Sequence, residues 1–343
     1  MNASTDNQRS DLFVFLLLLV ILITAFYLLR PPLLLLLHYG FGLGPSAEQA
    51  AVPQPDDLWT SPSPSQPQVI VPPAPPASLA SASAMLSEER WVKDEYAQMS
   101  ASMQQVAEQI FVLTNGERAS RSLTELLDEI NLAEIAVRHS RDMLERTYLS
   151  HDSPDGDGPA QRVARLHRTL FGLTSENVAE YSSQSIPDDA LAAEFNQMWM
   201  ESPGHRRNIL AANSTHLGVG CAEGADASIS RNQMRKCTQL FANAYAFADK
   251  PIPEEASVGA RLRTSLYPVS GKPLPTSIVQ TDLATDRPPQ GAVPAALVQN
   301  GSRAEGQLDL VGPPGLYNLS IHVPSPDGTG GYLIIPGPFV WVR

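Results

Sequence analysis

The chain has 343 residues, of which 36 are acidic and 24 are basic, giving a formal net charge of −12 at pH 7. No segment is basic and no run of Lys and Arg alternates with aromatic residues, so we expect no binding to nucleic acid. The length allows two domains with additional segments. The two cysteines, Cys221 and Cys237, are too few for a zinc cluster built from thiolates alone.

The N-terminal part predicts a membrane anchor. Residues 12–29 form an apolar run interrupted only by Thr24. As a helix this run would extend about 27 Å, close to the thickness of the bilayer core. Because the apolar character continues beyond it, we expect a transmembrane anchor over residues 12–37 after a short tail of residues 1–11. A cleaved signal peptide, which would give a secreted protein, is the alternative; the length of the run and the lack of a small-residue cleavage motif favour the anchor.

A linker and a helical lead-in are expected next. Residues 38–84 are rich in Pro, Ser and Ala and cannot bury a core, which is typical of an extended, semi-rigid stalk. The prolines stop near residue 85, and residues 85–102 read as a helical lead-in. The sequence leaves open whether this lead-in packs on the following domain or extends the stalk.

Helical periodicity dominates the middle of the chain. One apolar stripe predicts a helix that ends near Asn115-Gly116, and a second helix carries His139 on its apolar stripe, which is typical of a core histidine. A third stripe recurs every fourth residue on a helix that Pro187 and Asp188 would open. Its members are Leu191, Phe195 and Trp199.

Candidate site residues lie where these elements end. Ser202 is a natural N-cap and Pro203 suits the first position of a new helix, which places His205 in its first turn. An imidazole there suits metal ligation, general-base chemistry or anion contact, although a structural histidine is the simpler alternative. His151 lies in a loop after a helix, and Glu176 precedes a short apolar alternation.

Two β-like runs, residues 217–221 and 237–245, predict a hairpin. Cys221 would end one strand and Cys237 would begin the next, so a disulfide is expected, worth about 3 kcal/mol for a loop of this length. A disulfide indicates an oxidising compartment and places this part of the chain outside the cytoplasm. Two separate reduced thiols are the alternative.

Several short motifs occur in an order that resembles the CAP superfamily (cysteine-rich secretory proteins, antigen 5, pathogenesis-related 1) in its bacterial SCP-like form. The resemblance covers about residues 103–248. The motifs are Asn115-Gly116-Glu117-Arg118, Asp142-Met143, His151-Asp152-Ser153-Pro154, Glu176-Asn177, Trp199-Met200, Ser202-Pro203-Gly204-His205-Arg206, Asn208-Ile209-Leu210 and Leu217-Gly218-Val219-Gly220.

The resemblance implies an α+β fold, an α-β-α sandwich, with a central cleft lined by two histidines and two acids. His151 and His205 match the histidines and Glu176 matches one acid. The position of the second acid is Ser202 here, and Glu201, one residue earlier, would point elsewhere on the helix. The family pattern of two acids is therefore incomplete in this chain.

The three matched residues suggest two functions. Binding of a lipid, glycan or other envelope component is the first function that the resemblance implies. The alternative is a hydrolase, protease-like, in which His151, Glu176 and His205 hold a divalent metal such as zinc and leave one position for water. A serine mechanism through Ser202 lacks an orienting acid, and a purely structural domain is the third possibility.

Residues 255–343 lose helical periodicity, and short β-rich runs alternate with Pro and Gly turns. This pattern predicts a small β-sandwich, an immunoglobulin-like accessory domain, with His322 on a polar face. The complete prediction is a single-pass membrane protein whose bulk lies outside the cytoplasm.

Overall fold

The computed structural model describes residues 94–229, 231–283, 285, 287–328 and 330–343, all within one compact unit. The predicted anchor and the Pro-rich linker lie outside these residues. Within the described part of the chain, no helix is long and apolar enough to cross a membrane.

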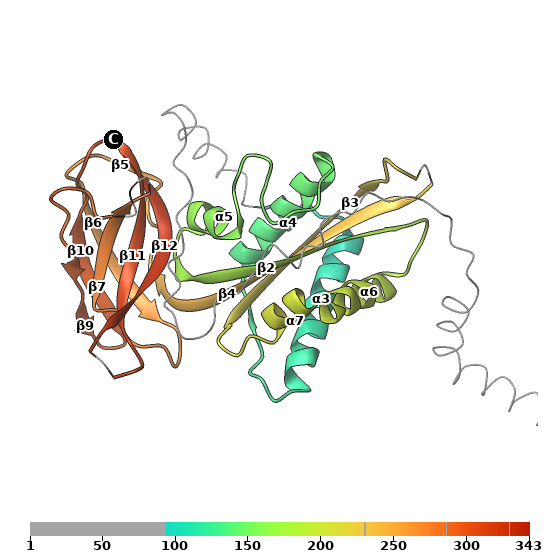
Figure 1. Ribbon diagram of the computed structural model, residues 1–343, viewed down its shortest axis with the longest axis horizontal. Helices are drawn as coiled ribbons and strands as arrows, with labels where there is room; N and C mark the ends of the chain where they lie inside the picture. The colour runs from blue at the N-terminus through green and yellow to red at the C-terminus, as the bar shows by residue number, and fades with distance from the viewer. Residues whose placement is uncertain (1–93, 230, 284, 286, 329) are drawn as a thin grey trace, which may run out of the picture. The chain divides into compact units, whose positions relative to one another are not determined.

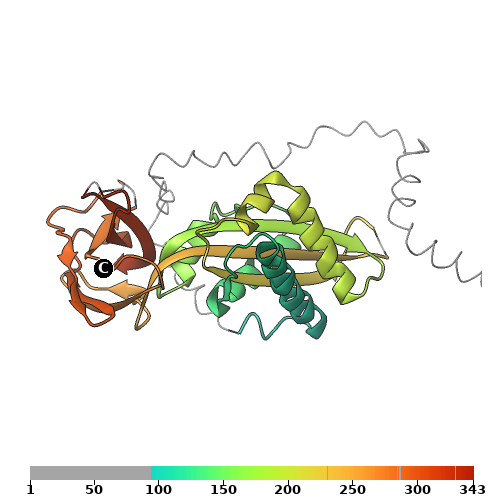
Figure 2. The ribbon, with the colours of Figure 1, turned by 90° about the horizontal axis from the view of Figure 1, so that it is seen from below.

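Residues 94–248 form three layers (Figure 1). Four strands form the central part of a sheet, in which β4 lies between β3 and β2, and the short β1 flanks β3. Helices α4 and α5 lie on one side of the sheet, whereas α3, α6 and α7 lie on the other, and Figure 2 shows α3 beside α6. The α-β-α arrangement predicted from the sequence is confirmed. The elements are α3 (Ala101–Ala119), β1 (Leu127–Asp128), α4 (Ile130–Glu145), α5 (Pro159–Leu166), β2 (Leu170–Ser183), α6 (Asp188–Glu201), α7 (Pro203–Ile209), β3 (His216–Ala225) and β4 (Gln233–Ala248).

Helix α3 begins after the described part of the expected lead-in. Residues 94–99 lie in turns and a bend, and Ser100 caps the helix by accepting a hydrogen bond from the Met103 N–H. The prediction that this helix ends near Asn115 was wrong, because it continues to Ala119. The Asn115 side-chain amide donates a hydrogen bond to the Leu126 carbonyl and accepts one from the Leu126 N–H. Asn115 therefore joins α3 to the following segment and does not end the helix.

Alternation along the strands gives the sheet two hydrophobic cores. Leu217, Val219 and Cys221 face α3 and α6, where they join Phe195 and Trp199 in a fully buried cluster. Leu240, Ala242 and Ala244 of β4 pack against α4 and α5, and the β3 partners of Leu240 and Thr238 are glycines. The predicted stripe on α6 is thus confirmed as a core face.

Gly218 and Gly220 allow α4 to lie directly on the sheet. A Cβ atom at Gly220 would lie 2.1 Å from the backbone nitrogen of Val137, and one at Gly218 would lie 2.1 Å from that of Ala133. Backbone atoms cannot yield as a flexible side chain can, so helix and strand would have to separate.

We predict that Gly220→Ala lowers the free energy of unfolding by about 3 kcal/mol, the cost of overpacking a closely packed layer. Gly116→Ala is the matched control, since a Cβ there would meet nothing within 4 Å and alanine favours a helix. Urea unfolding of both variants measures the effect. Equal stability of the two variants would contradict this account of the glycines.

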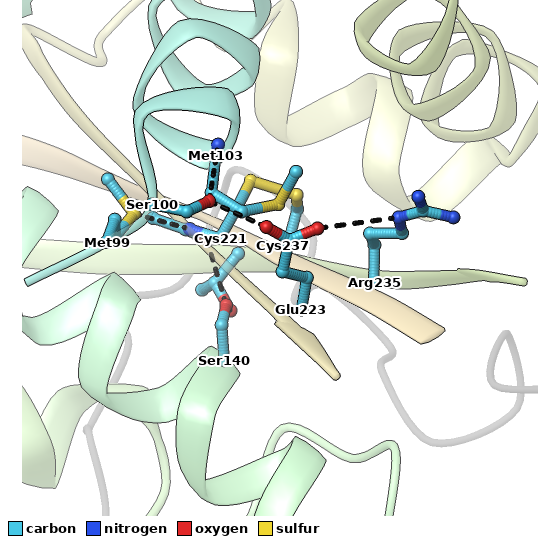
Figure 3. The surroundings of a disulfide bond; sticks show 10 residues. Met99, Ser100, Met103, Ser140, Cys221, Glu223, Arg235 and Cys237 are labelled. Carbon is cyan, nitrogen blue, oxygen red and sulfur yellow. Dashed lines mark hydrogen bonds and ion pairs between the residues drawn. A yellow bond between two sulfur atoms is a disulfide. The ribbon is translucent and has the colours of Figure 1, made fainter. Parts of the chain in front are cut away.

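A disulfide joins Cys221 and Cys237, as the sequence predicted. The two residues are paired directly across β3 and β4, and both are buried on the α3 side of the sheet. Figure 3 shows Met99 and Met103 beside the bond, and the Met99 sulfur accepts a hydrogen bond from the Cys221 N–H. The disulfide therefore lies beneath the start of α3.

Replacing both cysteines with alanine should lower the free energy of unfolding by about 3 kcal/mol, because the unfolded chain loses its cross-link. Thermal unfolding with and without a reductant measures this effect. The reductant should destabilise the wild-type chain and leave the double variant unchanged; a wild-type chain that ignores the reductant would count against the prediction.

The C-terminal region is β-rich, as predicted. Strands β6, β9 and β10 continue the sheet of the first region, whereas β5, β7, β8, β11 and β12 form a second sheet, and an apolar core lies between them. Pro336 and Gly337, which the sequence suggested as a turn between β-rich runs, lie inside the single strand β12. The immunoglobulin-like assignment stays a prediction. The strands are β5 (Glu255–Ala256), β6 (Arg261–Pro268), β7 (Ser277–Asp282), β8 (Ala295–Ala296), β9 (Val298–Asn300), β10 (Arg303–Asp309), β11 (Gly315–Pro324) and β12 (Tyr332–Val342).

The two regions share structure at their junction. The end of β4 pairs with β6, so one sheet runs through both regions. Phe171 of β2 is fully buried in the C-terminal core, against Gly337, where an added Cβ would meet its ring at 2.3 Å. Arg168 donates hydrogen bonds to the carbonyls of Ile252 and Phe339. The C-terminal region is therefore packed against the first one.

Candidate functional site

The three residues matched by the sequence come together from three separate elements. Glu176 lies in β2, His151 follows α4 in a loop, and His205 lies in the first turn of α7. His151 Nδ1 is 2.9 Å from Glu176 Oε1, and the centroids of the two imidazole rings are 6.3 Å apart. The predicted grouping of these side chains is therefore present.

Glu176 is a buried carboxylate with a partner at each oxygen. Its side chain is 1 % exposed; Oε1 faces His151, and Oε2 accepts a hydrogen bond of 2.6 Å from the Arg162 guanidinium. Burial by itself would raise the pKa of Glu176, but the charge of Arg162 and the neighbouring histidines lower it to about 2. The group is thus an anion at any physiological pH.

This anion determines the tautomer of His151. An ionised carboxylate can only accept, so Nδ1 of His151 donates to it. In the neutral ring the lone pair then lies on Nε2, on a side chain that is 33 % exposed. A carboxylate that fixes one ring nitrogen and leaves the other to a metal or ligand is a common device in metal and catalytic sites.

His205 is held in place through the backbone of its helix. Ser202 is the N-cap and Pro203 the first residue of α7, as the sequence predicted. The Asn177 side chain donates to the His205 carbonyl, and the Asn208 side chain donates to the Glu176 carbonyl. Two asparagines thus fasten α7 to β2 beside the carboxylate.

Arg162 and His139 complete the surroundings of the carboxylate. Arg162 comes from α5, is buried, and also donates to the His151 carbonyl, so it fixes the loop as well as the charge. His139 Nε2 lies 3.8 Å from Glu176 and donates to the Ser150 carbonyl. Its burial agrees with the predicted core role. Sequence reasoning missed Arg162, because nothing in its helix distinguishes a buried arginine from a surface one.

Glu201, the acid next to the expected position of the second acid, does not join this group. Glu201 is exposed and accepts a hydrogen bond from Gln197, one turn earlier on α6. The expectation that it points elsewhere on the helix agrees with this contact. The carboxylate at the site is therefore Glu176.

The side chains at this site can be compared with the ligands that a metal ion needs. In the part of the chain that the structure describes, no group of three His, Cys, Asp or Glu side chains is arranged to hold a metal ion. Both oxygens of Glu176 already have partners, so the carboxylate orients His151 in this arrangement. The two imidazoles are the groups that fit a divalent metal, and a ligand set of His151, Glu176 and His205 stays a prediction.

Comparisons with known proteins identify a family whose model matches part of this chain. The model of the cysteine-rich secretory protein (CAP) family matches residues 111–233. The uncharacterised protein YkwD of Bacillus subtilis is 35% identical over 111 residues, covering 32% of this chain and 40% of its own. The uncharacterised membrane protein YlbC of the same organism is 35% identical over 136 residues, covering 39% of this chain and 34% of its own.

An extracellular protein of Bacillus anthracis that contains an SCP domain is 34% identical in its crystal structure, with a TM-score of 0.31 and 40% of each chain covered. The chain spans less than half the length of the curated relatives described here. Residues 111–233 belong to a CAP domain of the bacterial SCP-like kind.

The buried His139 makes stability depend on pH. Burial lowers the pKa of His139 to about 4 from 6.5, so the unfolded chain binds a proton at a pH where the folded chain does not. The contribution of His139 to the free energy of unfolding should be fully present above pH 6.5. It should fall by on the order of 3 kcal/mol as the pH drops towards 4. Because the pKa of Glu176 is lowered from 4.5 to about 2, the free energy of unfolding should fall further as the pH drops through this range.

We predict that His139→Gln, whose amide can still donate to Ser150, removes most of the loss between pH 6.5 and 4. Urea unfolding at a series of pH values measures the slope. An unchanged slope in the variant would assign the pH dependence to other groups.

Proposed function

We propose that this protein is an extracytoplasmic, membrane-anchored binding module that contacts a lipid, a glycan or another envelope component through His151 and His205. The observation that carries this proposal is the hydrogen bond from His151 to the buried Glu176 anion. It fixes the imidazole so that a lone pair is presented on a partly exposed side chain. A ligand with a hydroxyl, ammonium or amide donor would complement it.

The location is supported by three observations. The disulfide is stable in an oxidising compartment, the apolar run of residues 12–29 is long enough to span a bilayer, and a relative of this domain is named a membrane protein. Together they favour an anchored domain outside the cytoplasm.

A metal-dependent, protease-like hydrolase is the second candidate. It is favoured by the approach of the two imidazole rings, 6.3 Å between centroids, together with the carboxylate that orients one of them. A metal held by these rings would supply a polarised water. The chain's own contribution would be to orient the rings and to keep Glu176 ionised.

Retention of the full-length chain in detergent, on peptidoglycan sacculi and on beads that carry phospholipid headgroups, tests the proposal. In detergent the predicted anchor has no bilayer to insert into. We expect His151→Ala/His205→Ala to reduce retention on one of these probes at least tenfold. His322→Ala, a histidine in the C-terminal region, is the control and should bind like the wild type. Circular dichroism checks that the double variant is folded, and equal retention of all three chains would refute the proposal.

Zinc titration by calorimetry on the same chains separates the two candidates. One-to-one binding that the double variant loses, followed by peptide hydrolysis that a chelator abolishes, would favour the hydrolase. Zinc binding that the double variant retains would exclude both histidines as its ligands.

A further inference from the structure

Strand β2 forms an edge of the sheet directly at the site. It pairs along Leu170–Ser183 with β4, and β4 is its one partner strand in the described residues. His151 approaches this edge from the α4 layer, and His205 approaches it from the α7 layer on the other side of the sheet. The two imidazoles therefore come from opposite layers of the domain, and their ring centroids are 6.3 Å apart.

The hydrogen bonds define which backbone groups face outward. Asn208 donates 3.0 Å to the Glu176 carbonyl, so this carbonyl points away from β4. In an antiparallel pair the N–H and C=O of one residue point the same way, and the direction alternates along the strand. Val178, Glu180 and Ser182 must therefore also direct their N–H and C=O groups outward.

Helix α7 seals the edge only at one end. Its Asn208 covers the carbonyl of Glu176. The outward backbone groups of Val178, a residue that is 7 % exposed, and of the exposed Glu180 have no hydrogen-bond partner in the described residues. Glu180 does not protect the edge with its charge, because its carboxylate lies 2.9 Å from the Lys236 ammonium of the neighbouring strand. An edge of this kind is a ready template for another strand.

We propose that the ligand of this site is an extended polypeptide, which adds to β2 as a further strand along Val178–Ser182. The inference rests on the proposed function and names its ligand class. Unpaired N–H and C=O groups at strand spacing are complementary to a polypeptide backbone and to no lipid tail. Five strand residues extend about 17 Å, enough for a short docked segment.

The position of the edge relative to the imidazoles supports this ligand. Val178 is two residues from Glu176, about 7 Å along the strand. A docked peptide that continues past Val178 would reach His151, whose Nε2 lone pair can accept from a backbone N–H. Backbone hydrogen bonds to the strand edge would provide most of the affinity. Contacts with the two histidines would select among peptides by their next residues.

Substitution of Glu180 gives a sharp test. Glu180→Pro removes the outward N–H without removing a bond to β4, because that group does not point towards β4. Glu180→Ala is the matched control: it also loses the contact with Lys236, but it retains the N–H. The probe is carbamidomethylated lactalbumin, a permanently unfolded polypeptide, together with its tryptic peptides.

Amide hydrogen exchange of the full-length chain, resolved at residues 176–183, is measured with and without the probe. We expect exchange at Val178 and Glu180 to slow at least tenfold in the wild type, and Glu180→Ala to retain the protection at Val178. In Glu180→Pro the affinity should fall at least tenfold. Absence of protection, or equal affinity of the two variants, overturns the inference.

Failure of this inference is distinct from failure of the proposed function. If the polypeptide gives no protection while retention on sacculi or on headgroup beads still requires His151 and His205, the ligand class is wrong and the binding site stands. If neither result is obtained, both proposals fall.

Discussion

The ionised carboxylate of Glu176 is the group on which the arrangement of the site depends. It is 1 % exposed, and a buried charge is tolerated only when partners replace the lost water. Arg162 supplies the opposite charge and His151 supplies a donor, while His139 lies 3.8 Å away. Each of these partners comes from a different segment, so the requirement to satisfy one carboxylate fixes two helices, a loop and a strand together. The hydrogen bond to this carboxylate also sets the orientation of the partly exposed His151 ring.

The site combines a rigid interior with a partly exposed rim. Behind the carboxylate, α4 lies so close to β3 that only glycines fit at Gly218 and Gly220. In front of it, β2 pairs with β4 alone among the strands that the structure describes. This arrangement places the His151 ring, which is 33 % exposed, at the boundary between a packed core and the outer edge of β2.

Much of this arrangement could be predicted from the sequence, because it follows local rules. The stripe on α6, the helix start at Ser202-Pro203 and the cysteine pair were all confirmed. The full extent of β2 was not predicted: it is buried on both faces around Asn177, so it lacks the alternation that marks a half-buried strand. The role of Arg162 was missed for a related reason. Its burial depends on Glu176, fourteen residues away, and no local pattern encodes a pair that forms only in the folded chain.

The sheet that runs through both regions has a mechanical consequence. Phe171, anchored in the C-terminal core, is five residues from Glu176 on the same strand, and β4 continues from the disulfide into its pairing with β6. Tension on the C-terminal region would thus load the ladder between β2 and β4 along its length, and many hydrogen bonds would resist it at once. Strand β2, which carries Glu176, would therefore also carry the applied force. Force applied to the C-terminal region would be transmitted along β2 to Glu176 and to the imidazoles beside it.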